Sequence, residues 1–240
     1  MSDVSATSRA EAHGHHHGDV SGGWLRAGVF GAMDGLVSNT ALIAGVGGGG
    51  APPRAIVLSG VAGLIAGAIS MALGEYTSVK TQNEQLDLEV AKERRELERN
   101  PEGELAELAE LYRERGLDPA LAHEVAVQLS RDPETALRVH VMAELGLSPE
   151  EKPSPWVAAF SSLLTFSVGA AFPLLPYLLG MSLLWAALVS GGIGLVGAGA
   201  LSSRFTPQPW WYAGLRQLVF GAVAAGITYL IGMAIGVSVA

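Results

Sequence analysis

Residues 153–240 read PSPWVAAFSSLLTFSVGAAFPLLPYLLGMSLLWAALVSGGIGLVGAGALSSRFTPQPWWYAGLRQLVFGAVAAGITYLIGMAIGVSVA and contain only two charged side chains, Arg204 and Arg216. So long a stretch without further charge has no polar face to offer to water and therefore needs lipid around it. Turn residues divide it into three apolar segments, each close to the ~20 residues that cross a hydrocarbon core. The sequence predicts three membrane helices here, at about 156–179, 182–203 and 211–239.

Two further apolar segments come earlier in the chain, at Trp24–Val46 and at about 55–79. The turn between them contains four glycines and two prolines. Five spans in total place the two termini on opposite sides of the membrane. Lysine and arginine gather beside one set of span ends, whereas the other set has only Arg54, so the positive-inside rule puts the N-terminus and residues 80–152 in the cytosol. We expect a multi-pass protein of a bacterial cell membrane or an organellar membrane.

The segment between the second and third spans, residues 80–152, is charged and helical in character. Its excess of acidic residues accounts for the whole formal net charge of −8. It has no proline or glycine before Pro101, so the second membrane helix is expected to continue into water as a stalk. Three pairs of a capping residue followed by proline then start new helices: Asn100-Pro101, Asp118-Pro119 and Asp132-Pro133.

The predicted fold class is therefore an all-α polytopic membrane protein with five transmembrane helices and a cytosolic helical metal-binding domain inserted between helices 2 and 3. We divide the chain into a disordered histidine-containing tail, the first two membrane helices, the inserted domain and the last three membrane helices, with bounds 1–22, 23–79, 80–152 and 153–240. Tight helix packing is the favoured interpretation of two glycine pairs, and a dimer seam is the alternative. The pairs are Gly63 with Gly67 and Gly232 with Gly236.

Composition excludes several classes of function. The chain has no cysteine, which removes disulfides, thiolate metal sites and cysteine nucleophiles. The acidic balance argues against nucleic-acid binding, which needs a clustered basic surface. The sequence has no Ser/His/Asp arrangement and no cofactor-binding loop, so we expect neither an enzyme nor a prosthetic group.

Two acidic residues, Asp34 and Glu75, lie inside predicted spans, where insertion of a carboxylate costs roughly 2.5 to 3.5 kcal/mol. The sequence shows no obvious basic partner for either. Met71 precedes Glu75 by four residues and so projects from the same side of its helix. A carboxylate together with a thioether favours Fe2+ or Co2+ over Mg2+ and Ca2+, although Met71 is also interpretable as a packing residue. Because a buried carboxylate has a raised pKa, a proton and a metal ion would exclude each other there, which suggests metal/proton exchange.

The inserted segment carries glutamates at helical spacing. Glu89, Glu93 and Glu96 form one stripe on the stalk, and Glu104 and Glu107 repeat the spacing on the next helix. A solvated acidic face is one interpretation; the other is that two facing helices supply four carboxylates to bridged divalent ions, as in helical bundles. His140 and Glu144, four residues apart, would complete that shell. The tail histidines at positions 13 and 15–17 are either a weak metal collector or an inert tail.

These features together resemble the vacuolar iron transporter family. The resemblance rests on DGLVSN at 34–39, on SMALGEY at 70–76, and on Glu93, Glu96, Glu104 and Glu107 between spans two and three. It implies a homodimer whose first spans line a central pathway, with Asp34 and Met71 coordinating the ion in transit. It also implies a cytosolic domain that binds metal through the four glutamates and Glu144, and Fe2+/H+ exchange out of the cytosol. One position departs from the family pattern: His140 stands where members can have methionine, with Met142 two residues away.

We therefore predict a transporter that exports divalent transition metals from the cytosol, Fe2+ first and Mn2+, Co2+ or Zn2+ as further substrates. Its partners would be metal ions, protons, membrane lipid and a second copy of the chain. The alternative is a membrane-anchored metal sensor or buffer, in which only the glutamate-rich domain binds metal. The two hypotheses differ at Asp34, because only a transporter needs that side chain.

Overall fold

The computed structural model describes residues 23–146, 148 and 152–239, so the predicted histidine-containing tail lies outside the described residues. Within these ranges every regular element is helical and there is no strand. The elements are, in chain order, α1 (Gly23–Gly48), α2 (Pro53–Arg99), α3 (Pro101–Glu114), α4 (Pro119–Leu129), α5 (Pro133–Leu145), α6 (Pro155–Ala171), the 3-10 turn η1 (Phe172–Leu174), α7 (Leu175–Leu178), α8 (Leu184–Ser202), the 3-10 turn η2 (Ser203–Phe205) and α9 (Trp210–Val239).

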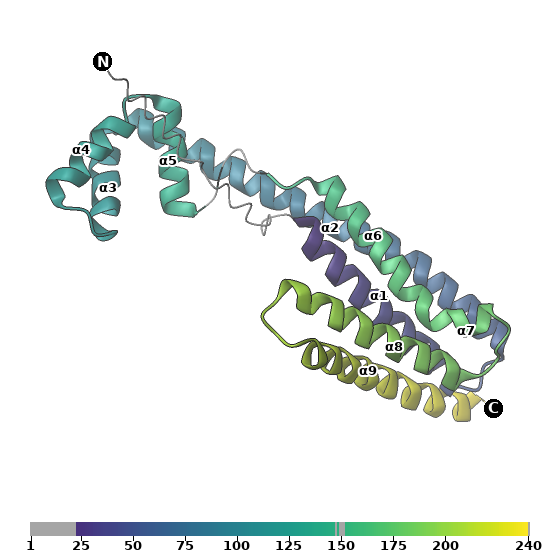
Figure 1. Cartoon of the computed structure of the whole chain (residues 1–240). Coiled ribbons are helices and arrows are strands. Elements are labelled where there is room, and N and C mark those ends of the chain that lie inside the picture. The colour runs from purple at the N-terminus through teal and green to yellow at the C-terminus, as the bar shows by residue number, and fades with distance from the viewer. Residues whose placement is uncertain (1–22, 147, 149–151, 240) are drawn as a thin grey trace, which may run out of the picture.

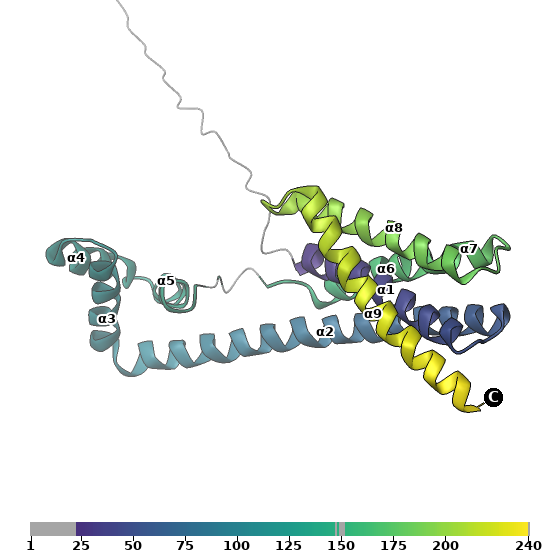
Figure 2. The ribbon, with the colours of Figure 1, turned by 90° about the horizontal axis from the view of Figure 1, so that it is seen from below.

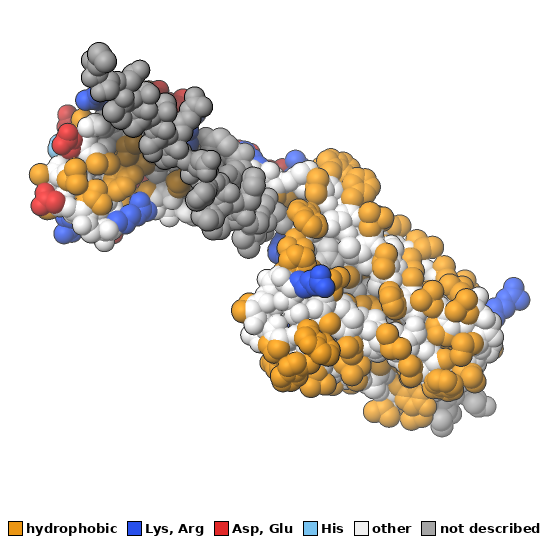
Figure 3. Space-filling view, viewed as in Figure 1, with side chains coloured by type: hydrophobic (Ala, Val, Ile, Leu, Met, Phe, Trp, Pro, Cys, Tyr) orange, Lys and Arg blue, Asp and Glu red, His pale blue; other side chains and the backbone are white. Residues whose placement is uncertain are grey.

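Five of these helical segments are long and apolar enough to cross a membrane, which confirms the predicted all-α polytopic fold. They form one bundle, in which α1 is central and contacts α2, α6, α8 and α9 (Figure 1). Hydrophobic side chains are spread over the visible outer face of this bundle with few basic groups among them, whereas the acidic side chains in view lie on the other part of the molecule (Figure 3). Such an apolar exterior matches a lipid environment.

Helix α2 joins the bundle to the smaller helical domain without a break (Figure 2). Its 47 residues exceed the ~20 that span a hydrocarbon core, so its charged C-terminal part lies outside the membrane. The predicted stalk is this part of α2. The helix ends at Arg99, and the side chain of the next residue, Asn100, accepts a hydrogen bond from the Gly103 amide and so caps α3. Asp118 and Asp132 cap α4 and α5 in the same way.

The third predicted span is divided into α6, η1 and α7. Pro173 has no N–H for the helical bond to Gly169, so the regular helix cannot continue through it. At this point the Asn39 side chain of α1 donates a hydrogen bond from Nδ2 to the Ala170 carbonyl, at 2.6 Å. The break in the third span is therefore fixed against the central helix of the bundle.

Glycines on α9 allow it to pack closely on α1. A Cβ atom added at Gly232 would lie against the Gly45 carbonyl oxygen, closer than real contacts permit, and one at Gly236 would meet Gly49. The second predicted pair, on α2, has the same effect: added Cβ atoms at Gly63 and Gly67 would meet Leu42 and Phe166. Tight packing within one chain is thus confirmed for both pairs. A dimer seam stays a prediction.

Gly232→Ala should therefore loosen the contact between α9 and α1. We expect a loss of about 1–3 kcal/mol of stability, because the added methyl group meets backbone that cannot move aside. Gly226→Ala is the matched control on the same helix, since a Cβ atom there has nothing within 4 Å. The control should be neutral or stabilising by up to about 1 kcal/mol through helix propensity. Thermal unfolding in detergent measures both, and equal melting temperatures for the two variants would contradict the packing argument.

Candidate metal centre

The smaller helical domain is built on the packing of α5 against the stalk part of α2. Leu86 of α2 and Leu137 and Val141 of α5 form a small buried core between the two helices. Next to it, the Arg94 guanidinium donates two hydrogen bonds to the Glu134 carboxylate, at 2.7 and 3.1 Å. These contacts fix the rotation of α5 about its axis relative to α2.

Helix α3 completes the enclosure of the site. The Asn100 cap turns the chain sharply after α2, and the buried Leu108 side chain anchors α3 in the domain. At the far end of α3, the Arg115 guanidinium donates a hydrogen bond to the Ala143 carbonyl of α5, at 2.9 Å. Three helices that are separate in sequence are thereby brought around one point.

Four side chains converge at this point: Glu93 from α2, Glu104 from α3, and His140 and Glu144 from α5. Each offers one ligand atom, and these four atoms all lie within 4.8 Å of one another. The His140 Nδ1 atom is 3.2 Å from Glu93, 3.7 Å from Glu104 and 3.5 Å from Glu144, measured to the nearest carboxylate oxygen. The His140 side chain is fully buried, whereas that of Glu144 is 29% exposed.

The centre of this group lacks the hydrogen bonds that buried polar atoms normally make. Both His140 nitrogens and the Glu93 Oε1 atom are buried and have no hydrogen-bond partner among the described residues. Leaving such groups unsatisfied is costly. A divalent cation would satisfy the His140 Nδ1 and Glu93 Oε1 atoms together, since it takes carboxylate oxygens and a neutral imidazole nitrogen as ligands. This donor set suits Zn2+, Fe2+ or Co2+ better than Ca2+ or Mg2+.

The electrostatics of the site also favour a bound cation. Burial raises the pKa of the Glu93 carboxyl to about 7, and the negative charges of Glu144 and Glu104 add to the shift. Burial likewise raises the pKa of Glu104, where the charge of Glu107 adds to the effect. Without a metal ion, protons are the available compensation for this concentration of carboxylates.

The pKa of Glu93 predicts how the stability of the metal-free protein depends on pH. The folded state keeps this proton up to about pH 7, whereas the unfolded chain releases it near its usual pKa of 4.5. The free energy of unfolding should therefore fall as the pH rises from about 5 to about 8. Glu93→Gln should remove much of this dependence. Melting temperatures in detergent with a chelator test this, and parallel pH curves for the two proteins would contradict it.

Two predicted ligands, Glu96 and Glu107, lie outside this four-residue group. Both are exposed, and they act on the site through their charges, which contribute to the raised pKa of Glu93. Met142, two residues from His140, is 52% exposed. That Glu96 and Glu107 join Glu93 and Glu104 in holding bridged divalent ions stays a prediction.

The predicted ligands in the membrane, Asp34 and Met71, each have contacts of their own. The Asp34 side chain accepts a hydrogen bond from the Ser38 hydroxyl one turn further along α1, at 2.9 Å. Met71 of α2 packs against a cluster formed by Ala68, Phe166 and Ala170. Neither of these contacts joins Asp34 to Met71, so a shared ion site between them stays a prediction.

The expectation that Glu75 has no basic partner is wrong. Arg26 in the first turns of α1 lies 3.5 Å from the Glu75 carboxylate, measured from Nη2 to Oε2. The pair forms because α1 and α2 are antiparallel. The start of α1 therefore lies beside the point where α2 leaves the membrane bundle toward the domain. Counting helical rise from the turn at residues 49–52 places the two residues at similar depth, and this is the signal in the sequence that could have found the pair.

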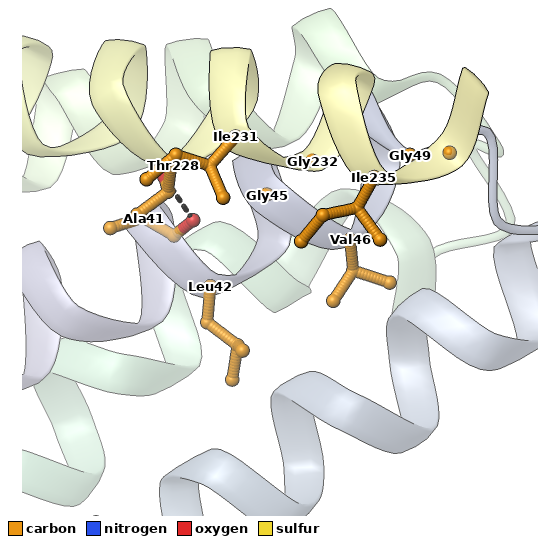
Figure 4. Close-up of a pocket in the computed structure, with 10 residues that line it drawn as sticks. Ala41, Leu42, Gly45, Val46, Gly49, Thr228, Ile231, Gly232 and Ile235 are labelled. Carbon is orange, nitrogen blue, oxygen red and sulfur yellow. Dashed lines mark hydrogen bonds between the residues drawn. The ribbon is translucent and has the colours of Figure 1, made fainter. Parts of the chain in front are cut away.

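One groove of the bundle is apolar and has no metal-binding character. It has a volume of about 690 Å³ and lies between α1 and α9 (Figure 4). Its lining contains no acidic residue, histidine or methionine. The Thr228 hydroxyl closes one side by donating a hydrogen bond to the Ala41 carbonyl, at 2.6 Å. The candidate metal chemistry therefore lies elsewhere, in the domain and around Asp34.

Comparison with known proteins adds a second line of information. The sequence model of the VIT family matches residues 25–233. A vacuolar iron transporter of Acanthamoeba castellanii is 41% identical over 224 residues, covering 88% of this chain and 78% of the relative. Vacuolar iron transporter 1 of Oryza sativa subsp. japonica is 35% identical over 94% of this chain and 92% of its own length. Vacuolar iron transporter 1 of Arabidopsis thaliana is 31% identical, with 89% and 88% covered.

Proposed function

Because this chain belongs to the VIT family, we propose that it is a membrane transporter that carries divalent transition metals, Fe2+ first, out of the cytosol. One observation carries the proposal. The buried, unpartnered imidazole of His140 lies among three carboxylates, one of which, Glu93, is borne by a helix that continues directly into the membrane. The relatives named above are called iron transporters, and Mn2+, Co2+ and Zn2+ are further substrates that the same donor atoms accept.

In this mechanism the domain captures the ion and the membrane helices pass it on. Glu93, Glu104, His140 and Glu144 hold the ion on the cytosolic side. Asp34 on the central helix α1 then supplies a carboxylate inside the bundle, and Met71 supplies a thioether from α2. Because α1 contacts all four other spans, it is the helix along which an ion can cross the bundle.

Protons are the proposed counter-substrate. A carboxylate surrounded by apolar helices is stable either with a proton or with a cation, so the arrival of one displaces the other. The domain site has the same property, since the pKa of Glu93 is about 7 and its proton must leave when a metal ion binds. Outward movement of metal would then be coupled to inward movement of protons.

We further propose that the active form is a homodimer. Only 6% of the most apolar stretch of α9 and 17% of that of α2 is buried within one chain, which leaves these faces to lipid or to a second copy. Asp34 is half-buried, and its hydrogen bond with Ser38 lies within its own helix. A second α1 across a two-fold axis would bring two such carboxylates to one pathway.

A flux measurement tests transport against the alternative of a metal buffer, which is favoured by the completeness of the domain site in a single chain. Purified protein is placed in sealed liposomes, and the accumulation of Fe2+ is followed under anaerobic conditions with and without a pH gradient. A transporter accumulates many ions per chain and responds to the gradient. Accumulation that stops at a few ions per chain would identify a buffer, and flux indifferent to the gradient would contradict proton exchange.

A further inference from the structure

Glu75 of α2 is an acidic side chain inside the bundle, and its carboxylate does not have all the hydrogen bonds that a buried charge normally makes. Its side chain is 12% exposed, and its Oε2 atom is buried without a hydrogen-bond partner among the described residues. The Arg26 guanidinium lies 3.5 Å away, beyond the roughly 2.7–2.9 Å of a charge-assisted N–H···O bond. The carboxylate is therefore balanced in charge but not saturated by hydrogen bonds.

The two partners of this ion pair differ in their exposure. The Arg26 side chain is 62% exposed and lies in the first turn of α1, so its guanidinium can turn away from Glu75 at little cost. The Glu75 carboxylate has no such alternative, and a buried charge left without a partner is strongly unfavourable. Arg26 is thus expected to leave Glu75 only when another cation takes its place.

The pair also lies between the two candidate metal positions. Arg26 precedes Asp34 by eight residues, about two helical turns, and Glu75 follows Met71 by four residues, about one turn. Both therefore lie on the domain side of Asp34 and Met71. At a similar level the small side chains of Ala27 and Ala158 pack with Val79, which draws α1, α2 and α6 together there.

We infer that Arg26 is a specificity-determining counter-ion, which occupies Glu75 until a divalent metal cation replaces it. This inference rests on the proposed transport function and adds the residue that controls access to Asp34. Because the metal ion takes the place of Arg26, the negative charge of the Glu75 carboxylate has a positive partner both before and after the exchange. A divalent ion brings twice the charge of Arg26 and binds the carboxylate oxygen directly, whereas Na+ or K+ brings only the same charge. The pair consequently admits divalent ions and rejects monovalent ones.

Substitution of Arg26 tests this directly in sealed liposomes under anaerobic conditions. Arg26→Gln should lower the half-saturating Fe2+ concentration by about threefold to tenfold, since the competing charge is gone. It should also make Fe2+ flux sensitive to added K+. Arg26→Lys, which keeps the charge, should behave like the original protein. Arg54→Gln, at the opposite end of the membrane part of α2, is the matched control and should change neither property.

A double substitution separates this role from a purely structural one. If Arg26 acts through Glu75, then Arg26→Gln should have no further effect on half-saturation once Glu75→Gln is present. Independent, multiplying effects of the two substitutions would overturn the inference. So would a response of Arg26→Gln identical to that of Arg54→Gln.

Equilibrium binding provides a readout that does not depend on transport. The full chain carrying Glu93→Gln and His140→Gln, in which the domain site is disabled, is dialysed against radioactive Fe2+ with and without Arg26→Gln. Tighter binding in the Arg26 variant, again by about threefold to tenfold, supports the inference. If the original protein shows no flux, the proposed transport function fails. The role of Arg26 is tested separately, and unchanged Fe2+ binding in the Arg26 variant would overturn it.

Discussion

Asp34→Asn is expected to lower Fe2+ flux by about a hundredfold, equivalent to roughly 3 kcal/mol, while leaving the protein folded. The amide keeps the size of the side chain and can still accept the hydrogen bond from the Ser38 hydroxyl. It loses the negative charge, which in the low-dielectric interior of the bundle is the main attraction for a divalent ion. Initial rates of Fe2+ uptake in liposomes, at equal amounts of inserted protein, measure the effect.

Ser38→Ala is the matched control for this experiment. It removes the hydrogen bond between Ser38 and Asp34 but keeps the Asp34 carboxylate, so flux should fall by no more than a few fold. Fe2+ binding by the domain should be unchanged in both variants, because Asp34 is far along the chain from that site. Near-normal flux in Asp34→Asn would exclude a transport site on this residue.

The second large effect is expected at His140. His140→Met should weaken the binding of Zn2+ and Co2+ to the domain by at least about tenfold to a hundredfold, a loss typical of damage to a metal-ligand shell. Methionine is close to histidine in volume, so the fully buried position stays filled while the imidazole nitrogen is lost. The thioether is a softer ligand, so the preference among first-row metals should change as well as the affinity.

The visible absorption of bound Co2+ reports this change, because it depends on the donor atoms and on their geometry. His123→Met is the control, since His123 is exposed on α4 and is not part of the group of four. An unchanged Co2+ spectrum and affinity in His140→Met would show that the imidazole is not a ligand. The carboxylates of Glu93, Glu104 and Glu144 would then hold the ion alone.

Local signals predicted most of the fold. The cap-and-proline pairs at Asn100, Asp118 and Asp132 start α3, α4 and α5 at the expected residues. The absence of glycine and proline between Glu75 and Asn100 predicted the continuous α2. These features depend on a few neighbouring residues, and so they can be predicted from the sequence. The division of the third span at Pro173 also has a local cause, although its anchoring by Asn39 does not.

The sequence predicted which residue types would form the candidate site, but not which of these residues would lie together. Helical spacing places Glu93 and Glu96 on one stripe, yet the structure brings only Glu93 into the buried group and leaves Glu96 exposed. That choice depends on the rotation of α5 about α2, which is set by the contacts of Arg94, Leu137 and Val141 across 40 or more residues of chain. The pairing of Arg26 with Glu75 is another contact between distant segments, and a single sequence does not record how two helices are offset.

The unbroken course of α2 gives the protein a lever. Met71 and Glu93 are 22 residues apart on one rigid rod, a separation of about 33 Å. A tilt of about 5° at the membrane end would move Glu93 by about 3 Å on this geometry, a displacement comparable to the distances between His140 and its three carboxylates. Because α3 and α5 are fixed to α2 by their own contacts, a tilt of α2 moves the whole ligand group relative to the other membrane helices, and the captured ion moves with it.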